Sequence, residues 1–530
     1  MTDTKLQIED EPGRYEDAVF PEDVPGGVSA ASENAPNEGV IRSVGVNTFY
    51  QVGSQIAPAI AAILAIPFLL RHFGPEAFGI VTLFSTALIY FTMLDLGLGR
   101  AATRFIAQSL EGGHADDVRR YFWGSIFLLT CVGVLVSIGC ELAIPTVVSH
   151  YLKIPPAYNH AAILSFYLIC GAIPMVTLTA TLRGMLEAWG KFPFISLVSA
   201  GNGIGLYLLP VVAVLLGGGL ISVAATYVLV RIGMGVALAI GCLRIEGRSS
   251  LKPILDTEAV KKMLSFGGWL SVSNIIGCAI LYGDRFLLGS SIGMAAVASY
   301  AVPMDVISRM QILVSSFCAV LFPLMSRLDQ SKSSHFRTVY RGALAIGLAL
   351  MTPLTIAIVV LAPILMRIWL RNRNTPEAVF AAQVFLAGAV VQATASIAFT
   401  ALHARGRSDM AAWMHMVEFP IYCVAFYWAA VHFGVRGAAL AWLGRVIVDF
   451  IGMVILLRLH KKEKGSFVQP ELLAALISVS ILFTIGLSGR IEAIVACIVC
   501  ILTWWWTWRT LVDQEMRAPM ARVLFGSRQR

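Results

Sequence analysis

The sequence predicts an all-α polytopic membrane protein with about 14 transmembrane helices. One observation is composition: 57% of the 530 residues are hydrophobic and 14% are charged, whereas soluble domains carry about 25% charged residues. The other is the series of apolar runs, each close to the roughly 20 residues that a helix needs to cross a bilayer. We expect two pseudo-symmetric six-helix bundles followed by an additional C-terminal helix pair.

The chain begins with a polar segment that differs from the rest. Residues 1–43 are acidic and proline-containing and lack a signal-peptide core, which predicts a disordered cytoplasmic tail. The apolar runs follow at 44–70, 79–99, 121–145, 161–182, 193–217, 220–243, 263–288, 295–326, 341–369, 376–402, 410–431, 436–458, 470–488 and 490–511. They divide into an N-terminal bundle at 44–245, a C-terminal bundle at 262–460 and a helix pair at 468–512, before a basic cytoplasmic tail at 513–530.

Basic residues concentrate in alternate connecting segments. LRIEGRSSLK (243–252), SRLDQSKSSHFR (326–337) and RLHKKEK (458–464) are examples. Lys and Arg accumulate on the cytoplasmic side of membrane proteins, so both termini are expected in the cytoplasm. The same rule explains the net charge of +8 without nucleic acid. The basic segment at 367–374 is an exception to it.

A faint internal repeat supports the two-bundle division. The segments IPFLLRHFGPEAFGIVTL (66–83) and GDRFLLGSSIGMAAVASY (283–300) both give FLL, a glycine-bearing turn and a new apolar run. Repeats of this kind place a transport site between the halves, near the bilayer midplane. Prolines such as Pro58 and Pro67 inside the first run predict kinks that suit alternating access.

Charged side chains interrupt several apolar runs. A charge at the bilayer centre costs roughly 2.5–3.5 kcal/mol, so these residues are expected to face a cavity, a partner or the interface. The arginines predicted to form a central cationic cavity are Arg100, Arg104, Arg231, Arg285, Arg309 and Arg445. The acids predicted to couple an ion or to pair charges are Asp95, Asp284, Asp305, Glu418 and Asp449.

The spacing of these charges separates two interpretations. Asp305 with Arg309, and Arg445 with Asp449, are four residues apart and share a helical face, so each pair is expected either to neutralise itself or to serve the cavity. Arg231 has no acid within four residues and is the strongest candidate for an anion contact. Arginine suits a pyrophosphate because its fork binds oxygens bidentately and stays charged.

The motifs of soluble enzymes are missing from the sequence. It has neither the G-x-x-x-x-G-K-[ST] loop of P-loop ATPases nor the H-E-x-x-H pattern of metalloproteases. The cysteines fall almost all inside apolar runs and are expected to pack there. We therefore expect no catalytic residues, no metal and no cofactor.

Three local patterns carry a resemblance to a known family. The first run ends in a turn of the form L-R-x-x-G-x-x-x-F-G, the second in L-D-x-G-x-x-x-A-x-x-R, and the fourth in R-G-x-x-E-A-x-G-x-F. The matching residues are Leu70, Arg71, Gly74, Phe78 and Gly79, then Leu94, Asp95, Gly97, Ala101 and Arg104, then Arg183, Gly184, Glu187, Ala188, Gly190 and Phe192. The chain resembles the Wzx-type polysaccharide flippases of the multidrug/oligosaccharidyl-lipid/polysaccharide exporter superfamily.

The resemblance implies a function in surface polysaccharide synthesis. Such flippases move undecaprenyl-pyrophosphate-linked oligosaccharide units across the lipid bilayer, and glycosyltransferases and a polysaccharide polymerase are the implied partners. The alternatives are a cation-coupled multidrug or metabolite antiporter of the same superfamily, a lipid II flippase, and a membrane glycosyltransferase or ligase. Arginines in the middle of apolar runs favour an anionic substrate over the cations of an antiporter.

Overall fold

The computed structural model describes residues 38–93, 98–112, 114–250, 254, 256–331, 333–370 and 375–459, together with residues 498, 501, 502 and 505. Residues 1–37 of the predicted tail, most of the predicted helix pair at 468–512 and the tail at 513–530 lie outside this set. The first helix begins at Glu38, inside the segment expected to be a tail. From Phe49 onward the chain forms one compact unit.

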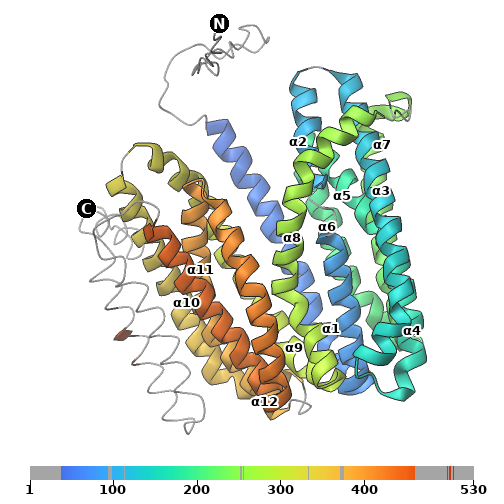
Figure 1. Cartoon of the computed structure of the whole chain (residues 1–530), viewed down its shortest axis with the longest axis vertical. Coiled ribbons are helices and arrows are strands. Elements are labelled where there is room, and N and C mark those ends of the chain that lie inside the picture. Colours follow the sequence, from blue (N-terminus) through green and yellow to red (C-terminus); the bar gives the residue numbers. More distant parts are fainter. Residues whose placement is uncertain are drawn as a thin grey trace, which may run out of the picture. The chain divides into compact units, whose positions relative to one another are not determined.

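Helices make up the regular structure of the described residues (Figure 1). A π-helical turn, η1 (Val147–Tyr151), follows α3. The helices are α1 (Glu38–Met93), α2 (Leu98–Glu111), α3 (Ala115–Thr146), α4 (Pro156–Gly171), α5 (Ile173–Ala188), α6 (Phe192–Leu215), α7 (Leu220–Ser250), α8 (Thr257–Ser291), α9 (Met294–Ser331), α10 (Ser333–Trp369), α11 (Pro376–Ala404) and α12 (Ser408–Leu459).

Two of these elements are too long for one membrane crossing. In the described part of the chain, eight helical stretches are long and apolar enough to span a membrane, and two of them, Gly53–Thr92 and Asp409–Leu457, have 40 and 49 residues. Each contains a glycine where two helices meet: Gly74 (φ 75°, ψ 173°) and Gly434 (φ 65°, ψ −148°). Glycine adopts positive φ without the steric cost that a Cβ imposes. The all-α, multi-pass class is confirmed, while the full set of 14 helices stays a prediction.

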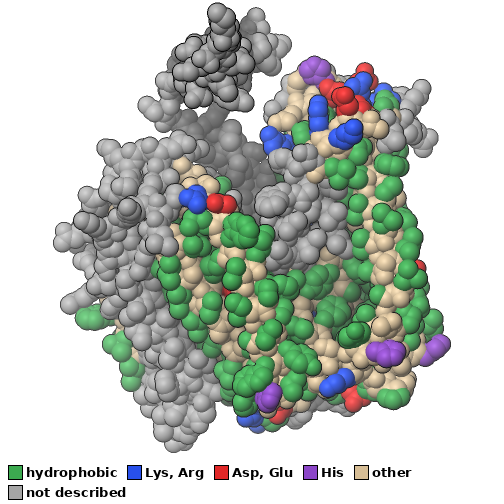
Figure 2. All heavy atoms as spheres, viewed as in Figure 1, with side chains coloured by type: hydrophobic (Ala, Val, Ile, Leu, Met, Phe, Trp, Pro, Cys, Tyr) green, Lys and Arg blue, Asp and Glu red, His purple; other side chains and the backbone are tan. Residues whose placement is uncertain are grey.

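The outer surface has the character expected in lipid. Figure 2 shows hydrophobic side chains over the middle of one face and charged side chains toward its two ends. On α3, Leu135, Ile138 and Leu142 are each more than half exposed (70%, 51% and 77%). Since the free energy of burying such side chains is available from lipid as well as from protein, these positions indicate a bilayer-facing surface.

Three large apolar cores and a small cluster of Val314, Met351 and Ala393 hold the described helices together. The largest combines residues of both predicted bundles. In it the ring of Phe84 of α1 meets that of Phe166 edge to face, and the ring of Tyr300 of α9 meets that of Phe385 of α11 in the same way. A second core lies among α2, α3, α5 and α7, and a third joins α9 to α12. We call residues 44–245 the N-terminal half and residues 262–460 the C-terminal half. The two halves share one core near the turns at Gly74 and Gly434, and have separate cores toward the opposite helix ends.

Helix α8 links the two halves. Its first turns pack with the N-terminal half, where Met263 belongs to the core among α2, α3 and α5. Its last turns meet the same half at η1, because Lys153 N donates to Gly289 O (3.1 Å) and Lys153 Nζ to Ser291 O (2.5 Å). A Cβ at Gly79 would overlap the carbonyl of Met294, at the start of α9. The shared core is thus reinforced by close backbone contact.

Candidate functional site

A polar cavity of about 570 Å³ lies within the N-terminal half. Helices α1, α2, α5, α6 and α7 contribute its lining residues. Three arginines from three of these helices line it: Arg100, Arg183 and Arg231. The other lining residues are Thr92, Gly99, Thr103, Val176, Thr179, Ala180, Gly184, Glu187, Ser199, Asn202 and Met234. The lining therefore combines apolar groups with hydroxyl, amide, guanidinium and carboxylate groups.

Small residues allow two walls of this cavity to approach each other. A Cβ at Gly184 of α5 would lie 2.7 Å from Thr103 Oγ1 and 3.0 Å from Gly99 O, both on α2. The Thr103 hydroxyl donates to Gly99 O (2.9 Å), so it stays within its own helix. This close approach, typical of membrane helices with small interfacial residues, brings the helices that carry Arg100 and Arg183 together.

The three arginines in the cavity differ in whether a carboxylate neutralises them. Arg183 Nε donates to Glu187 Oε1 (2.7 Å), one turn away on α5. Neither Arg100 nor Arg231 forms an ion pair with any residue that the structure describes. Arg231 is 6% exposed, and its Nε has no hydrogen-bond partner among those residues. An unpaired buried charge is costly, so Arg231 is a candidate for an anion contact, whereas Arg100 is exposed.

The structure brings together some of the predicted cavity arginines and separates others. Arg231 and Arg100 share the cavity. Arg104 lies one turn further along α2, is exposed, and is not among the lining residues. Asp95 lies outside the described residues. Arg183 was not a predicted site residue, although its R-G-x-x-E motif is part of the family resemblance.

A second group of charges lies where α8 and α9 meet the N-terminal half. Arg285 Nη2 donates to Asp305 Oδ1 (2.5 Å) and Arg285 Nη1 to Thr86 Oγ1 (3.1 Å). Asp284 accepts from Tyr300 OH (2.7 Å).

The ion pair expected between Asp305 and Arg309 is therefore replaced by one between Asp305 and Arg285. Arg309 donates instead to Tyr207 OH on α6 (2.7 Å). Residues on facing helices can contact a buried side chain as easily as residues on its own helix. Here both Asp305 and Arg309 have their partners on other helices.

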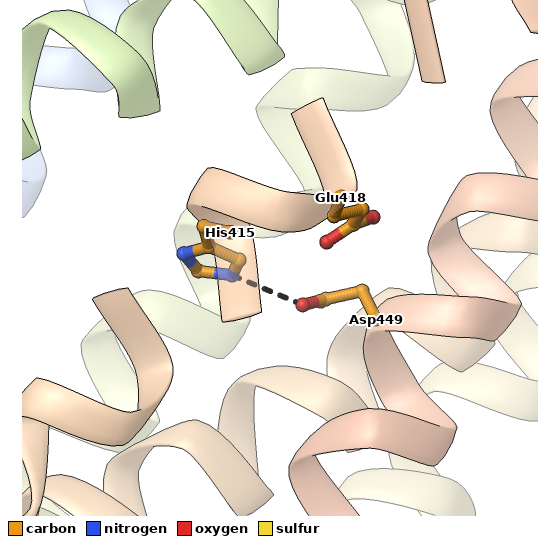
Figure 3. Close-up of side chains that lie close together, drawn as sticks. All are labelled: His415, Glu418 and Asp449. Carbon is orange, nitrogen blue, oxygen red and sulfur yellow. Dashed lines mark hydrogen bonds and ion pairs between the residues drawn. The ribbon is translucent and has the colours of Figure 1, made fainter. Parts of the chain in front are cut away.

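A third group lies within the C-terminal half (Figure 3). His415 and Glu418 come from the first helix of α12, and Asp449 comes from its second helix. His415 Nε2 and Asp449 Oδ1 are 3.0 Å apart and share a hydrogen bond.

Arg445 lies next to this group and takes partners other than the one its spacing predicts. Its Nη1 is 3.7 Å from Glu418 Oε1 and its Nη2 is 3.5 Å from Gln392 Oε1. The expected pairing of Arg445 with Asp449 is thus replaced by partners on facing helices. His415 was not predicted as a site residue, although the spacing H-x-x-E with Glu418 places both on one helical face.

More than half of the chain matches a known protein family. Residues 44–329, more than half of the chain, match the family described as polysaccharide biosynthesis protein. The chain belongs to this family. A putative O-antigen transporter of Shigella flexneri is 25% identical over 405 residues, which cover 76% of this chain and 95% of that protein. The family is one of transporters, as the resemblance predicted, and not of enzymes.

Solved structures of transporters share the fold. An inward-facing multidrug resistance MATE family transporter of the MOP superfamily matches with a TM-score of 0.64 at 14% identity, covering 81% of this chain and 99% of that one. A MOP superfamily transporter from Pyrococcus furiosus matches with a TM-score of 0.53 at 15% identity, covering 82% and 96%. The chain therefore has the fold of these transporters.

Proposed function

We propose that this chain translocates undecaprenyl-pyrophosphate-linked oligosaccharide repeat units across the bacterial cytoplasmic membrane, and that Arg100 and Arg231 bind the pyrophosphate. The observation that carries the proposal is the polar cavity in which these two arginines lack ion-pair partners among the described residues. A pyrophosphate supplies several anionic oxygens, and guanidinium groups bind such oxygens bidentately.

The depth of the cavity strengthens this interaction. Arg231 is almost completely buried, and the attraction between opposite charges grows as the effective dielectric constant falls. The hydroxyl groups of Thr103 and Thr179 and the amide of Asn202 add hydrogen-bonding groups for the headgroup or the first sugar. A cationic drug would meet repulsion here, which favours the lipid-linked anion over the antiporter alternative.

The arrangement of the cores supports alternating access. One core joins the two halves, and separate cores lie toward their other ends. Cys242 and Met325, which precede the basic segments 243–252 and 326–337, belong to those separate cores. By the positive-inside rule we expect these ends, and both termini, in the cytoplasm. The halves would pivot about the shared core and open the cavity to each side in turn.

The acidic residues have a more limited role in this proposal. Asp284 is bound by Tyr300 and Asp305 by Arg285, which favours charge pairing over ion coupling at both positions. The lipid bilayer holds the isoprenoid portion of the substrate. Glycosyltransferases would supply the substrate on the cytoplasmic side and a polysaccharide polymerase would consume it on the other.

Genetic complementation tests the proposal. In bacteria deleted for this gene, the wild-type chain should restore surface polysaccharide. Arg231→Glu and Arg100→Glu should insert normally yet fail to restore it, with polyprenyl-diphosphate oligosaccharide accumulating in the cytoplasmic leaflet. Arg436→Glu is the matched control, because Arg436 is exposed and contacts the Phe380 ring instead of the cavity; it should complement fully.

The same experiment separates the alternatives. Drug hypersensitivity with normal surface glycan in the deletion strain would support the antiporter. Arrested cell-wall synthesis with accumulated lipid II would support a lipid II flippase. Normal export by both Arg→Glu variants would refute the assignment of the cavity to the pyrophosphate.

A further inference from the structure

We infer that His415, Glu418 and Asp449 form a binding site for a divalent transition-metal ion, with Zn²⁺ as the representative ligand (Figure 3). The site lies in the C-terminal half, apart from the polar cavity lined by Arg100 and Arg231. It rests on its own geometry and does not depend on the proposed flippase function.

The three ligands converge from two helices. His415 and Glu418 are three residues apart on one helical face, and Asp449 faces them from the second helix of α12 (Figure 3). Their ligand atoms all lie within 4.8 Å of one another, and His415 Nε2 is 3.0 Å from Asp449 Oδ1. Zinc bonds of about 2.0–2.2 Å in tetrahedral geometry separate ligand atoms by roughly 3.4 Å. A small rotation of the Glu418 side chain completes the set.

Glu418 provides an independent reason to expect a ligand. Its side chain is 7% exposed, and neither carboxylate oxygen has a hydrogen bond from the described residues. Arg445 Nη1, the cationic group paired with it, is 3.7 Å from Oε1, beyond hydrogen-bond reach. A buried carboxylate without hydrogen bonds is costly. Figure 3 shows it directed toward the space beside Asp449, where a cation would satisfy it.

The local charge favours a cation. Two carboxylates face one guanidinium, and metal ligation takes the neutral imidazole of His415. Arg445 is also held by Gln392 Oε1 at 3.5 Å. Because the 3.7 Å contact of Arg445 with Glu418 Oε1 is an ion pair without a hydrogen bond, the lone pairs of the Glu418 carboxylate stay available to an ion.

The donor set selects the class of metal. One imidazole nitrogen with two carboxylate oxygens suits Zn²⁺ and neighbouring first-row ions, whereas Ca²⁺ takes six to eight oxygens and Mg²⁺ keeps several waters. The His415 ring stacks on Phe399 of α11, with centroids 6.1 Å apart and planes at 20°. Its side chain is 27% exposed, which leaves a route for the ion and a position for a water as fourth ligand.

Calorimetry on the purified full-length chain tests the inference. The protein should carry a histidine-free affinity tag and be reconstituted in lipid nanodiscs. Titration with Zn²⁺ should show one site per chain with a micromolar or lower Kd. His415→Ala and Asp449→Asn should each weaken binding by about tenfold or more. X-ray absorption of the zinc complex should show nitrogen and oxygen ligands at about 2.0–2.2 Å.

A second histidine on α12 serves as the matched control. His432 is exposed and its Nδ1 contacts Trp428 O at 2.8 Å, so His432→Ala should bind Zn²⁺ like the wild type. All variants are compared at equal size-exclusion profile, and Glu418→Gln, which preserves shape, replaces any variant that fails to fold. Absence of wild-type binding, unchanged affinity in the ligand variants, or equal loss in His432→Ala would each overturn the site. None of these outcomes depends on polysaccharide export.

Discussion

Two regions of this protein each bury an arginine to a similar extent, but the two arginines differ in their partners. Arg231 in the N-terminal cavity is 6% exposed and Arg445 in the C-terminal cluster is 8% exposed. Arg445 has Glu418 and Gln392 beside it, whereas Arg231 has no ion pair among the described residues. Burial costs both arginines a similar free energy. We propose that a fixed partner offsets this cost in the cluster and that a transient anionic ligand offsets it in the cavity.

The comparison predicts opposite consequences for the same substitution. Removing a paired charge leaves its partner buried and uncompensated, which costs far more than the pair itself contributes. Removing an unpaired charge relieves a desolvation cost. Stability and transport should therefore separate: substitutions in the cluster should change the free energy of unfolding, and substitutions in the cavity should change export.

The largest expected effect is on Arg445. Arg445→Met should lower the free energy of unfolding by about 3–5 kcal/mol, because Glu418 is left buried without a cation. The double variant Arg445→Met with Glu418→Met should recover most of this loss. Denaturant unfolding in detergent micelles, followed by tryptophan fluorescence, measures both. A double variant no more stable than the single one would show that the two side chains do not form a pair.

A smaller effect is expected at the wall of the cavity. Gly184→Ala places a Cβ 2.7 Å from Thr103 Oγ1 and 3.0 Å from Gly99 O, and such overpacking costs about 1–3 kcal/mol. Gly201→Ala on α6 is the control, since its Cβ would meet nothing within 4 Å; alanine there should stabilise the helix by up to about 1 kcal/mol. Equal stability of the two variants would mean that α2 and α5 are less closely packed than described.

The arginines of the N-terminal cavity could be predicted from the sequence more fully than the contacts in the C-terminal cluster. Arg231 could be predicted because a charge isolated in an apolar run needs a special environment whatever the tertiary structure. Arg100 follows the run 79–99 and was predicted together with Arg104, which does not line the cavity. The partners of Asp305 and Asp449 could not, because spacing within one helix reveals neighbours on that helix alone. Asp305 pairs with Arg285, and Asp449 with His415, 34 residues away in the chain. Such contacts depend on how helices rotate and pack.

The link between α6 of the cavity half and α9 should contribute less. Arg309 Nη2 donates to Tyr207 OH (2.7 Å), a partly exposed hydrogen bond. Tyr207→Phe should therefore lower the free energy of unfolding by about 1 kcal/mol. Arg309→Met should cost a similar amount, and the double variant should cost little more than either. Additive losses in this double-mutant cycle would show that the two side chains act independently.

The smallest expected change in stability is at Arg231. Arg231→Met should leave the free energy of unfolding within about 1 kcal/mol of the wild type or raise it, because the substitution removes an unpaired buried charge. Export should nevertheless be lost, and Arg231→Lys should retain part of it because a point charge replaces the bidentate fork. The unfolding and complementation assays described above measure both. A loss of stability as large as that of Arg445→Met would mean that Arg231 has a fixed carboxylate partner outside the described residues, with Asp95 the first to test. The cavity would then be a structural ion pair like the C-terminal cluster, and the contrast between the two halves would disappear.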